Sequence, residues 1–536
     1  MNSLKMNEQN NKYREQDKNA LYSNNDDKIS MDRLATFCKR KSIFFQSSYI
    51  YGGLSGFYDY GPIGTKMLDK LISLWKNYFF FMNQKIGINM HEMSCADIMP
   101  ENVFIASQHT KRFNDLVAVC AKNHVQRADH LIEQELQNKG INITNLSLEG
   151  KSKEELFSII KENNIKCPIC GSKIKEIRAQ NLMFGLYVGT ENKKAYLRPE
   201  TAQSAFVNFK LIYEANRKKL PFAISIIGKA YRNEISPRKL LLRMREFNQA
   251  EIQIFFNPSD FDNFINFDEI KDYKLNILLA DDRTQNTINF KKVKCRDLIN
   301  RFEKFYLYYL AKIQSFYIDV LKIDSERFRF YEMNEKEKAF YNIYHCDIQL
   351  KLNTNSWTEV AGLHYRGDHD LSGHDKLSKE SFKIKDEKTN NYFIPHVLEL
   401  SFGLDRNLFA LIDLAYYYDK DRDNVVLRLN KHLSAYNVAV FPLLTNKTEL
   451  VEKARQIYLN LIKLGLYNVF FDIKGSIGRR YARQDEIGTP YCITVDFDTL
   501  KDDTVTVRYR DSKKQERIKL NYLNDWLNKE FKLHFS

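Results

Sequence analysis

The residues best suited to chemistry lie between Arg198 and Glu251. This part of the chain contains RPETAQSAFVNFK and, further along, GKAYRNEISPRKLLLRMREFNQAE. Arginines, carboxylates and one aromatic residue are set among apolar residues here, a pattern that a purely structural core does not require. Guanidinium groups bind phosphates, carboxylates bind ammonium groups, and aromatic rings stack on bases. The stretch therefore predicts a site where a nucleotide and an amino acid are held together.

The elements that must position these side chains are strand-like runs separated by charged turns. Strands are predicted for AYLRPE, PFAISIIGKAYRNE, EFNQAEIQIFF and SWTEVAGLHYR, because alternate residues of a strand point to opposite faces. HVLELSFGLDRNLFALIDLAYYY predicts a strand and then a long apolar helix, and TKMLDKLISLWKNYFF predicts an amphipathic helix. We therefore expect an antiparallel sheet, flanked by helices, whose polar face carries the site.

The chain of 536 residues is long enough for two or three domains. Residues 1–30 are rich in Asn, which predicts a disordered tail. Residues 31–430 are predicted to form the main domain, with insertions at about 97–180 and 259–343. A charged helical pattern runs from Ala128 to Asn164, and the second insertion is also expected to be helical. After about residue 430 strands and helices alternate, which predicts a small α/β domain over 431–536.

Composition and charge limit the class of protein. The net charge of +14 favours a polyanionic partner, but a nucleotide-biased genome rich in Lys and Asn codons explains the same charge. Eight mostly scattered cysteines do not form a disulfide framework. No apolar run approaches the ~20 residues of a membrane span, and the acidic residues near the N-terminus fit neither a signal peptide nor a transit peptide. We expect a cytoplasmic protein with no membrane partner.

Several longer sequence motifs occur in the same order as in a known protein family. They are IYGGLSGFYDYGPIG, RADHLIE, NLMF, LRPETAQ, YRNEISPR, REF, ELSFGLDR and SIGRRYARQDEIGTPYCITVDFDTL. From about Asp32 to the C-terminal region the chain resembles glycyl-tRNA synthetases of the dimeric class II type. The resemblance implies an α+β fold, in which a class II antiparallel catalytic sheet precedes an α/β anticodon-binding domain.

The resemblance also implies an activity. Such an enzyme is a homodimer that activates glycine with ATP and Mg²⁺ to glycyl-adenylate and pyrophosphate. It then transfers glycine to the 3′-terminal adenosine of tRNA(Gly).

By this resemblance three residues are catalytic candidates. Arg232 would contact the α-phosphate of ATP, where charge changes during the reaction, and Arg406 would lie near the adenine and the γ-phosphate. Glu359 would face ATP and its Mg²⁺, which prefers oxygen ligands. Phe247 would stack on the adenine. The other ATP-binding candidates are Asn233, Glu234, Leu242, Arg243, Val360 and Gly403.

Glycine recognition poses a separate problem, because glycine has no side chain to hold. Its pocket must bind the ammonium group strongly and exclude any substituent on Cα. Carboxylates meet the first need, and no segment of the chain obviously encodes an editing domain. By resemblance the glycine-binding candidates are Arg127, Glu200, Phe247, Glu251, Arg366, Glu399 and Ser401. Arg127 could instead form a salt bridge with Asp129 or Glu133, and Arg366 and Ser401 could support their neighbours.

Four residues form a candidate metal site. CPICG contributes Cys167 and Cys170, and VCAKNH contributes Cys120 and His124, a set that suits structural zinc. Some family members carry a second CxxC pair before RADH, but this chain has Asn123 at the position of its second cysteine. A structural zinc site and a metal-free remnant both remain open.

Four cations of the C-terminal domain are candidates for tRNA binding. Lys474, Arg479, Arg480 and Arg483 lie around the glycine-rich turn GSIGRRY. Cations beside an aromatic residue suit an RNA loop, although a solvated helix face has the same composition. The family resemblance favours anticodon-stem recognition.

The chain departs from the family pattern at three positions. Ser204 and Gln108 stand where glycine is usual, and Leu400 stands where proline is usual. Ser204 is expected to add a side chain near the glycine pocket.

Two other functions compete with the first. One is a catalytically silent, nucleic-acid-binding paralogue, but the arginines and glutamates that the chemistry needs are all present. The other is a class II synthetase for another small amino acid. The set of three carboxylates (Glu200, Glu251 and Glu399) and the missing editing insertion argue against it.

Overall fold

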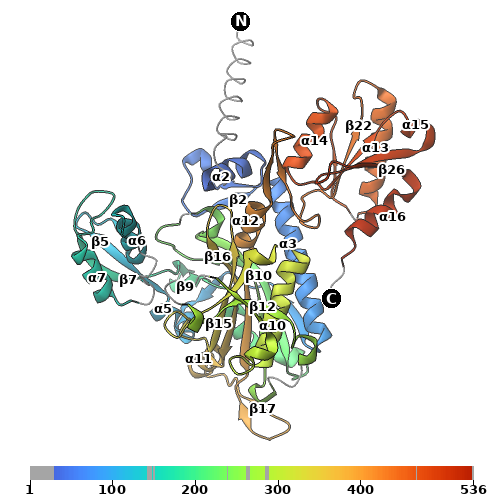
Figure 1. Cartoon of the computed structure of the whole chain (residues 1–536). Coiled ribbons are helices and arrows are strands. Elements are labelled where there is room, and N and C mark those ends of the chain that lie inside the picture. Colours follow the sequence, from blue (N-terminus) through green and yellow to red (C-terminus); the bar gives the residue numbers. More distant parts are fainter. Residues whose placement is uncertain are drawn as a thin grey trace.

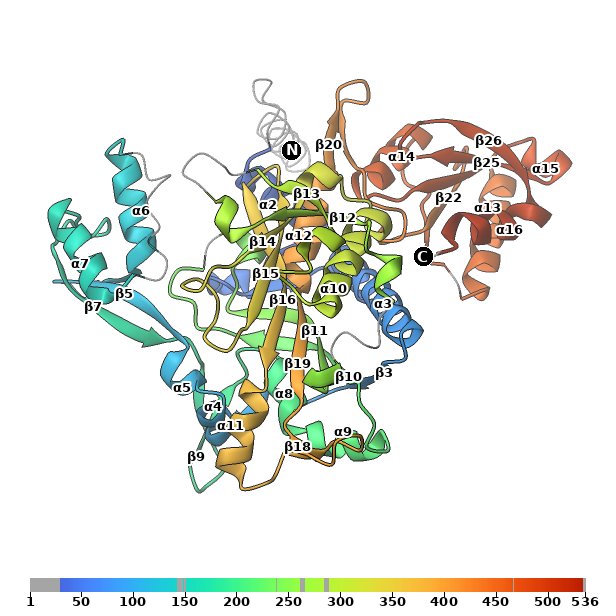
Figure 2. The same cartoon turned by 60° about the horizontal axis from the view of Figure 1, so that its bottom comes forward.

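The computed structural model describes residues 29–141, 148, 151–237, 239–260, 266–283, 289–465 and 467–533. Residues 1–28 of the predicted tail lie outside the described residues. A large sheet forms the centre of the molecule, the C-terminal α/β domain lies beside it, and a small inserted subdomain projects from the other side (Figures 1 and 2). The mixture of helices and sheets confirms the predicted α+β class.

The central sheet has nine strands and is mainly antiparallel, as predicted. Only the pairs β10–β3 and β12–β14 are parallel. In spatial order the strands are β13 (Lys291–Lys294), β12 (Lys274–Leu278), β14 (Phe328–Glu332), β15 (Tyr344–Lys351), β16 (Trp357–Gly367), β19 (His396–Gly403), β11 (Glu246–Phe256), β10 (Phe222–Tyr231) and β3 (Asn89–Met93).

The register of the central strands separates a polar face from an apolar one. Glu251 of β11 pairs with Ser401 of β19, and the neighbouring pair is Ile252 with Leu400. Because successive side chains of a strand point to opposite faces, Glu251 and Ser401 share one face and the two apolar residues share the other. The sheet therefore presents the predicted polar residues together.

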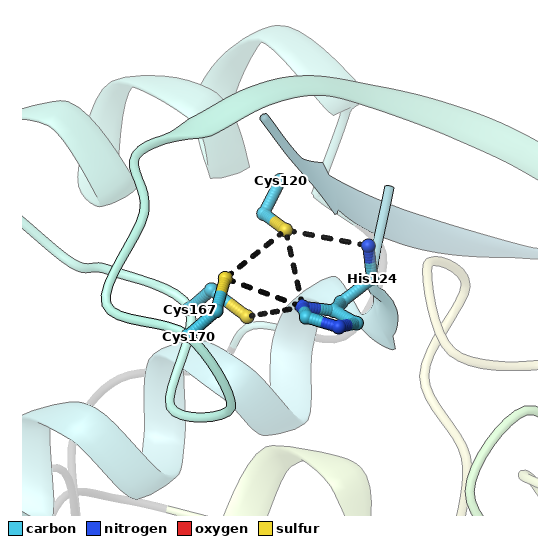
Figure 3. Close-up of side chains that lie close together, drawn as sticks. All are labelled: Cys120, His124, Cys167 and Cys170. Carbon is cyan, nitrogen blue, oxygen red and sulfur yellow. Dashed lines mark hydrogen bonds between the residues drawn. The ribbon is translucent and has the colours of Figure 1, made fainter. Parts of the chain in front are cut away.

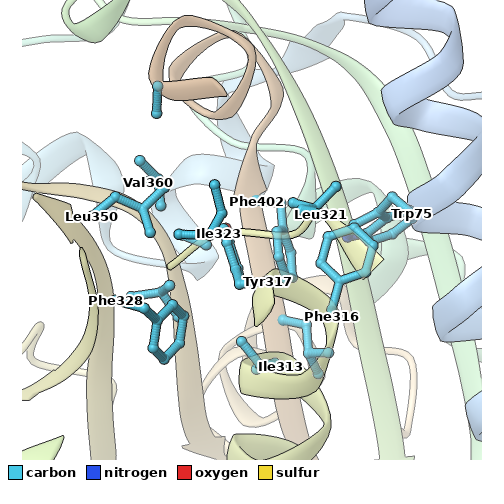
Figure 4. Close-up of a cluster of buried hydrophobic side chains, with 14 of the residues drawn as sticks. Trp75, Ile313, Phe316, Tyr317, Leu321, Ile323, Phe328, Leu350, Val360 and Phe402 are labelled. Carbon is cyan, nitrogen blue, oxygen red and sulfur yellow. The ribbon is translucent and has the colours of Figure 1, made fainter. Parts of the chain in front are cut away.

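The apolar face is covered by α3 (Pro62–Lys85), α10 (Lys304–Ser315) and α12 (Leu404–Ala415). Proline at the first position of α3 suits a helix start, because the N–H that it lacks has no partner there. Trp75 of α3 packs against Phe402 of β19, with ring centroids 5.8 Å apart, beside Phe316 and its neighbours (Figure 4). On the polar face, α8 (Ala202–Val207) and α9 (Phe209–Ala215) cover the end of the sheet near Phe255.

The segment 259–343 differs from its prediction. It was expected to be a helical insertion, but it contributes strands β12, β13 and β14 to the central sheet. The longest helices among the described residues of this segment are α10 and the short π-helix that follows it, Phe316–Val320. Its many Phe and Tyr residues are buried in the main core, which explains why their spacing resembled a helical pattern.

The inserted subdomain contains two helices, α6 (Ala128–Asn138) and α7 (Lys153–Glu162), where a charged helical pattern was predicted. They pack against a three-stranded sheet of order β6 (Val125–Arg127), β5 (Asn114–Cys120) and β7 (Ile174–Asn181). A second small sheet and two helices connect this subdomain to the main domain. They are β4 (Ile98–Pro100), β9 (Lys193–Leu197) and β8 (Gly185–Val188), with α4 (Glu101–Ala106) and α5 (His109–Arg112).

The C-terminal domain is a five-stranded mixed sheet with helices, as the alternating pattern predicted. Its strands, in spatial order, are β23 (Val469–Phe471), β22 (Val438–Pro442), β24 (Tyr491–Val495), β25 (Thr504–Tyr509) and β26 (Gln515–Lys519). Its helices are α13 (Thr448–Lys463), α14 (Ile477–Glu486), α15 (Thr499–Asp502) and α16 (Leu520–Phe531).

The remaining elements are short. They are α2 (Met31–Arg40), α11 (His369–Ser378) and the strand pairs β1 (Phe44–Gln46) with β2 (Tyr58–Tyr60), β17 (Ile384–Lys385) with β18 (Tyr392–Phe393), and β20 (Tyr416–Asp419) with β21 (Asn424–Leu427). Within the described ranges, no helix combines the length and the apolar character needed to cross a membrane.

Candidate active site

A pocket of about 220 Å³ lies on the polar face of the central sheet. One part of its wall carries carboxylates and another carries arginines. Most of the residues predicted for a nucleotide and an amino acid therefore come together in one place. The predicted residues that line the pocket are Glu200, Arg232, Glu234, Leu242, Arg243, Phe247, Glu251, Glu359, Val360, Glu399, Ser401, Gly403 and Arg406.

Three glutamates form the carboxylate part of the wall. Glu200, Glu251 and Glu399 are 6%, 2% and 4% exposed. Thr201 and Ser401 donate hydrogen bonds to the two carboxylate oxygens of Glu251, at 2.6 and 2.9 Å. Because both oxygens are held, the orientation of this carboxylate is fixed.

Arg366 lies beneath the glutamates with its guanidinium fully buried. It makes ion pairs with Asp370 (2.7 Å), Glu399 (3.0 Å) and Glu200 (3.4 Å). Its guanidinium carbon also lies 4.0 Å from the centroid of the Tyr341 ring. Arg366 does not itself line the pocket, so the structure makes it the support of the carboxylates, which is the plainer of the two predicted roles.

The carboxylates outnumber the cation that supports them. Burial raises the pKa of Glu399 to about 8, and Glu251 and Glu200 add to the rise against the opposing effect of Arg366. Burial and then Glu200 also raise the pKa of Glu251. Burial acts in the same direction on Glu200, but Arg366 and His109 hold the pKa of Glu200 well below its usual value. A cation among these groups would relieve their repulsion, so this part of the wall suits an ammonium group.

His364 forms a neutral wall next to the carboxylates. Its Nδ1 lies 3.1 Å from the amide nitrogen of Asn342, which assigns the ring proton to Nε2, 3.8 Å from Glu399. Burial, with His345 and Arg366, holds the pKa of His364 well below 6.5. Glycine at position 362 makes room for the ring, because a Cβ there would lie 2.3 Å from Nε2.

Arg232 is the most restrained arginine of the nucleotide part. Its Nε donates to the carbonyl of Pro199 at 3.0 Å, and its guanidinium carbon lies 5.3 and 5.4 Å from the ring centroids of Phe113 and Phe247. Its two terminal nitrogens make no hydrogen bond with a described residue. A guanidinium fixed in this way is ready to bind a phosphate.

Two further arginines are paired with glutamates at the pocket. Arg243 contacts Glu234 at 2.8 Å, and Arg406 contacts Glu359 at 2.9 Å. The Nε2 of His130, from α6 of the inserted subdomain, lies 3.3 Å from Arg243. Burial, together with Arg127 and Arg243, lowers the pKa of His130 to about 4, so the ring is neutral and accepts the hydrogen bond.

A second acidic group lies close to Glu359. Burial, and then repulsion from Glu359, raises the pKa of Asp347 to about 6. The Nε2 of His345 lies 2.9 Å from this carboxylate. Two neighbouring carboxylates on β15 and β16 supply the oxygen ligands that Mg²⁺ prefers.

Two other predicted site residues do not line the pocket. Arg127 makes ion pairs with Asp129 (2.5 Å) and Asp115 (3.3 Å) within the inserted subdomain, so the structure favours the salt bridge over substrate contact. The backbone N–H of Asn233 donates to the carbonyl of Leu182 at 2.7 Å, so the main chain at Asn233 is held outside the pocket wall.

None of the three residues that depart from the family pattern lines the pocket. Ser204 is buried on α8 and accepts a hydrogen bond from Arg198 at 3.4 Å, outside the pocket wall. The expectation that Ser204 adds a side chain near the glycine pocket therefore stays a prediction, although Ser204 is not part of the pocket wall itself. Gln108 has φ = 63°, the left-handed conformation that explains why glycine is favoured there. Leu400 faces the apolar core.

Several residues of the pocket wall were missed. Alternation along YHCDIQLK places His345 and Asp347 on one face, and alternation along β16 places Gly362 and His364 together. This period of two could have identified them. Tyr341 lies in an irregular segment and gave no such signal.

The candidate metal residues converge in the inserted subdomain (Figure 3). The ligand atoms of Cys120, His124, Cys167 and Cys170 all lie within 4.8 Å of one another. The distance from Sγ of Cys120 to Sγ of Cys170 is 3.7 Å, and Nδ1 of His124 lies 3.2 to 3.6 Å from the three sulfurs. With Zn–S bonds of ~2.3 Å and Zn–N bonds of ~2.0 Å, the edges of a tetrahedral site measure about 3.8 Å between sulfurs and about 3.5 Å between sulfur and nitrogen. The chain thus brings a complete Cys₃His donor set together.

The candidate RNA-binding cations divide into two groups. Lys474 and Arg479 are exposed, and Arg483 is partly exposed beside Asp472. Arg480 was wrongly placed with them, because it is 1% exposed and donates to the carbonyls of Pro442 and Leu443. It projects from α14 into the domain interior.

Comparisons with known proteins agree with this geometry. Residues 187–415 match the family described as tRNA synthetase class II core domain (G, H, P, S and T). Residues 437–530 match the family described as Anticodon binding domain. The antiparallel sheet, the arginine-lined pocket and the C-terminal domain define a class II aminoacyl-tRNA synthetase.

Curated relatives narrow the class. The glycine–tRNA ligase of Pyrococcus furiosus is 36% identical over 91% of this chain and 96% of its own length. That of Pyrococcus abyssi is 37% identical over the same shares. That of Aeropyrum pernix is 33% identical over 93% of this chain and 96% of its own length. The chain belongs to the glycine–tRNA ligase family.

The charge imbalance around Arg366 leads to a stability prediction. Replacing Arg366 with Met leaves the buried carboxylates without their cation, which is expected to lower the free energy of unfolding by about 3–5 kcal/mol near pH 8. Without the cation, the pKa values of the carboxylates are raised, so these groups destabilise the folded state while they are ionised. The loss of free energy of unfolding therefore becomes smaller as the pH falls towards 5 and the carboxylates are protonated.

Urea unfolding of both proteins at several pH values tests this, with Arg296→Met, an exposed arginine, as the control. A loss that does not change with pH would contradict the electrostatic role of Arg366.

Proposed function

We propose that the protein activates glycine with ATP, forming glycyl-adenylate and pyrophosphate, and then transfers glycine to the 3′-terminal adenosine of tRNA(Gly). The observation that carries this proposal is the set of three buried glutamates beside a wall of arginines. The names of the relatives and the class II core support the same activity.

Selection of glycine follows from the carboxylate part of the pocket. Glu200, Glu251 and Glu399 would hold the ammonium group through their surplus negative charge, and the wall around them would exclude a side chain on Cα. The half-buried ring of His364, held by Asn342, and the fixed Glu251–Ser401 pair leave little freedom to enlarge the wall. A larger amino acid would be rejected by contact with these groups, so selection needs no separate editing domain.

Adenylate formation is mainly a problem of position and charge. A carboxylate oxygen of glycine attacks the α-phosphorus, and the bond to the bridging oxygen breaks as pyrophosphate leaves with its electrons. Arg232 would contact the α-phosphate, Arg243 the outer phosphates, and Phe247 the adenine. In the second step the ribose hydroxyl attacks the glycyl carbonyl, and AMP leaves. Preorganised guanidiniums stabilise the charge that develops at the phosphorus.

Arg406 and the acidic pair complete the nucleotide site. Arg406 would lie near the adenine and the γ-phosphate, where ATP would compete with its present contact to Glu359. Glu359 and Asp347 would hold Mg²⁺, which supplies charge neutralisation for the phosphates when it is bound.

In the C-terminal domain, Lys474, Arg479 and Arg483 would contact the anticodon arm of the tRNA. Their exposure on and beside α14 supports this part of the proposal.

The family resemblance further implies a cytoplasmic homodimer. The exposed apolar loop between β1 and β2, where Tyr51 is 88% exposed, supports an interface at this face. We expect a dimer by sedimentation equilibrium and its weakening by Tyr51→Glu. A monomeric wild-type protein would contradict this part of the proposal, and cell fractionation tests the location.

The catalytic proposal is tested by ATP–pyrophosphate exchange with glycine, alanine and serine compared side by side. Wild-type protein should exchange with glycine alone. Arg232→Ala should lower the exchange rate by about 10²–10³-fold, because it removes a phosphate contact of the transition state. The binding of tRNA should remain nearly unchanged.

Arg40→Ala, at an exposed position on α2, is the matched control. Exchange with alanine or serine but not glycine would overturn the specificity. Absence of exchange with any amino acid would favour a silent nucleic-acid-binding paralogue.

We also propose that Cys120, His124, Cys167 and Cys170 bind a structural zinc ion. The ion would tie the β5–β6 hairpin to the turn before β7, and the donor distances given above support the assignment. Metal analysis should find one zinc per chain, and Cys170→Ser should lose it. Cobalt substitution should give the absorption of a tetrahedral thiolate site. Cys95→Ser, outside the cluster, should retain the metal; equal metal content in both variants would refute the site.

A further inference from the structure

Two residues of the inserted subdomain contact the arginines of the nucleotide site. Arg243 lies beside His130, from the first turn of α6, and Arg232 lies beside Phe113, the residue directly before β5. Arg232 and Arg243 line the pocket, but His130 and Phe113 do not. His130 and Phe113 are therefore placed to act on a bound nucleotide through these arginines.

His130 completes the restraint of Arg243. The Nε of Arg243 donates to the carboxylate of Glu234 at 2.8 Å, and one terminal nitrogen of Arg243 lies 3.3 and 3.5 Å from the two ring nitrogens of His130. The other terminal nitrogen makes no hydrogen bond with a described residue. A guanidinium held at two of its three nitrogens keeps one orientation, and its third nitrogen is available to a phosphate.

The neutral state of His130 suits this role. Burial lowers the pKa of His130 to about 4; Arg127 and Arg243 act in the same direction, and Asp129 opposes them. The unprotonated nitrogen of the neutral ring accepts a hydrogen bond from Arg243. A second carboxylate in this place, beside Glu234, would neutralise the guanidinium and compete with a phosphate for it. A neutral acceptor orients the guanidinium and leaves its positive charge for the ligand.

The start of α6 fixes the position of His130. Arg127, which directly precedes this helix, makes ion pairs with Asp129 at 2.5 Å and with Asp115 of β5 at 3.3 Å. The backbone N–H of His130 donates to the carboxylate of Asp129 at 2.8 Å. These contacts join the first turn of α6 to β5 and hold the imidazole against Arg243.

Phe113 has a corresponding position beside Arg232. The guanidinium carbon of Arg232 lies 5.3 Å from the ring centroid of Phe113 and 5.4 Å from that of Phe247. Attraction between a cation and two aromatic rings restricts the guanidinium, in addition to the hydrogen bond from its Nε to Pro199. Phe247 belongs to the central sheet and Phe113 to the inserted subdomain, so the two parts of the molecule hold Arg232 together.

The strand β5 connects both contacts within the subdomain. It begins directly after Phe113, carries Asp115, the partner of Arg127, and ends at Cys120. It pairs with β7 along its length and with β6 at 117–119. Because a strand that is paired on both sides is stiff, Phe113 and the start of α6 keep a fixed relation to each other. The subdomain therefore meets the two arginines as one body.

We propose that His130 and Phe113 are positioning residues of the nucleotide site, by which the inserted subdomain holds Arg243 and Arg232 in the orientation that meets the phosphates of ATP. The proposal rests on the proposed function, because it concerns the binding of the same ATP. The competing role is purely structural, in which the two contacts only attach the subdomain to the main domain. The two roles differ in which substrate is affected when the His130 side chain is removed.

The test uses the full-length variants His130→Ala and Arg243→Ala and the protein that carries both substitutions. His130→Gln keeps a neutral hydrogen-bond acceptor, and Gln134→Ala, at an exposed position one turn further along α6, is the matched control. The Kd for ATP is measured by titration calorimetry without glycine. The KM for glycine is measured by ATP–pyrophosphate exchange at saturating ATP.

His130→Ala should raise the Kd for ATP about tenfold, the effect of losing one hydrogen bond to a charged group, and leave the KM for glycine unchanged. His130→Gln should recover most of the affinity, and Gln134→Ala should bind ATP like the wild type. In the Arg243→Ala protein, loss of His130 should have no further effect, because His130 acts only through Arg243. Phe113→Leu should lower the exchange rate at saturating substrates about tenfold, and no further in the Arg232→Ala protein.

Three results would overturn the proposal. They are a Kd for ATP equal to that of the wild type in His130→Ala, an equal rise in its KM for glycine, and an undiminished effect of His130→Ala in the Arg243→Ala protein. Failure of the proposed function is separately visible, as a wild-type protein that binds ATP but shows no glycine-dependent exchange.

Discussion

The geometry of the site depends on one buried guanidinium. Arg366 contacts Asp370 from α11, Glu399 from β19 and Glu200 from the turn before α8. Buried ion pairs are weak contributors to stability, because desolvation offsets their attraction. The ion pairs of Arg366 are better explained by the positions that they impose on the carboxylates. They bring carboxylates from separate elements close together, and these carboxylates still outnumber the one arginine.

The central sheet sets the distance between the two halves of the site. Phe247 and Glu251 lie four residues apart on β11 and therefore on the same face. At a rise of ~3.4 Å per residue, the strand separates them by about 14 Å. Since β11 is paired with β10 over this whole length and with β19 from Gln249 onwards, this spacing is rigid. A rigid spacing between ammonium-binding and nucleotide-binding groups is what an in-line attack requires.

The sequence predicted the strands and helices of the site better than the burial of its side chains. Strong alternation and family strings predicted β10, β11 and the pocket position of Glu251. These patterns did not distinguish the buried arginines Arg366 and Arg480 from exposed arginines, because both kinds occur in segments rich in polar residues. The role of Arg127 was ambiguous, because Asp129 lies close enough in the sequence to form a salt bridge with it. Of the strands in 259–343, β12 and β14 were missed because burial on both sides removes the alternation that marks a strand.

The position of β19 has a consequence for how the molecule is assembled. It is the last strand of the central sheet along the chain, yet it lies between β16 and β11. Without residues 396–403 the strands of this sheet would fall into two groups, with unpaired edges on β16 and β11. Such edges are prone to pair with other chains, and long-range pairing of this kind is slow. β19 closes both edges and also carries Glu399, so the carboxylate site is complete only when the central sheet is continuous.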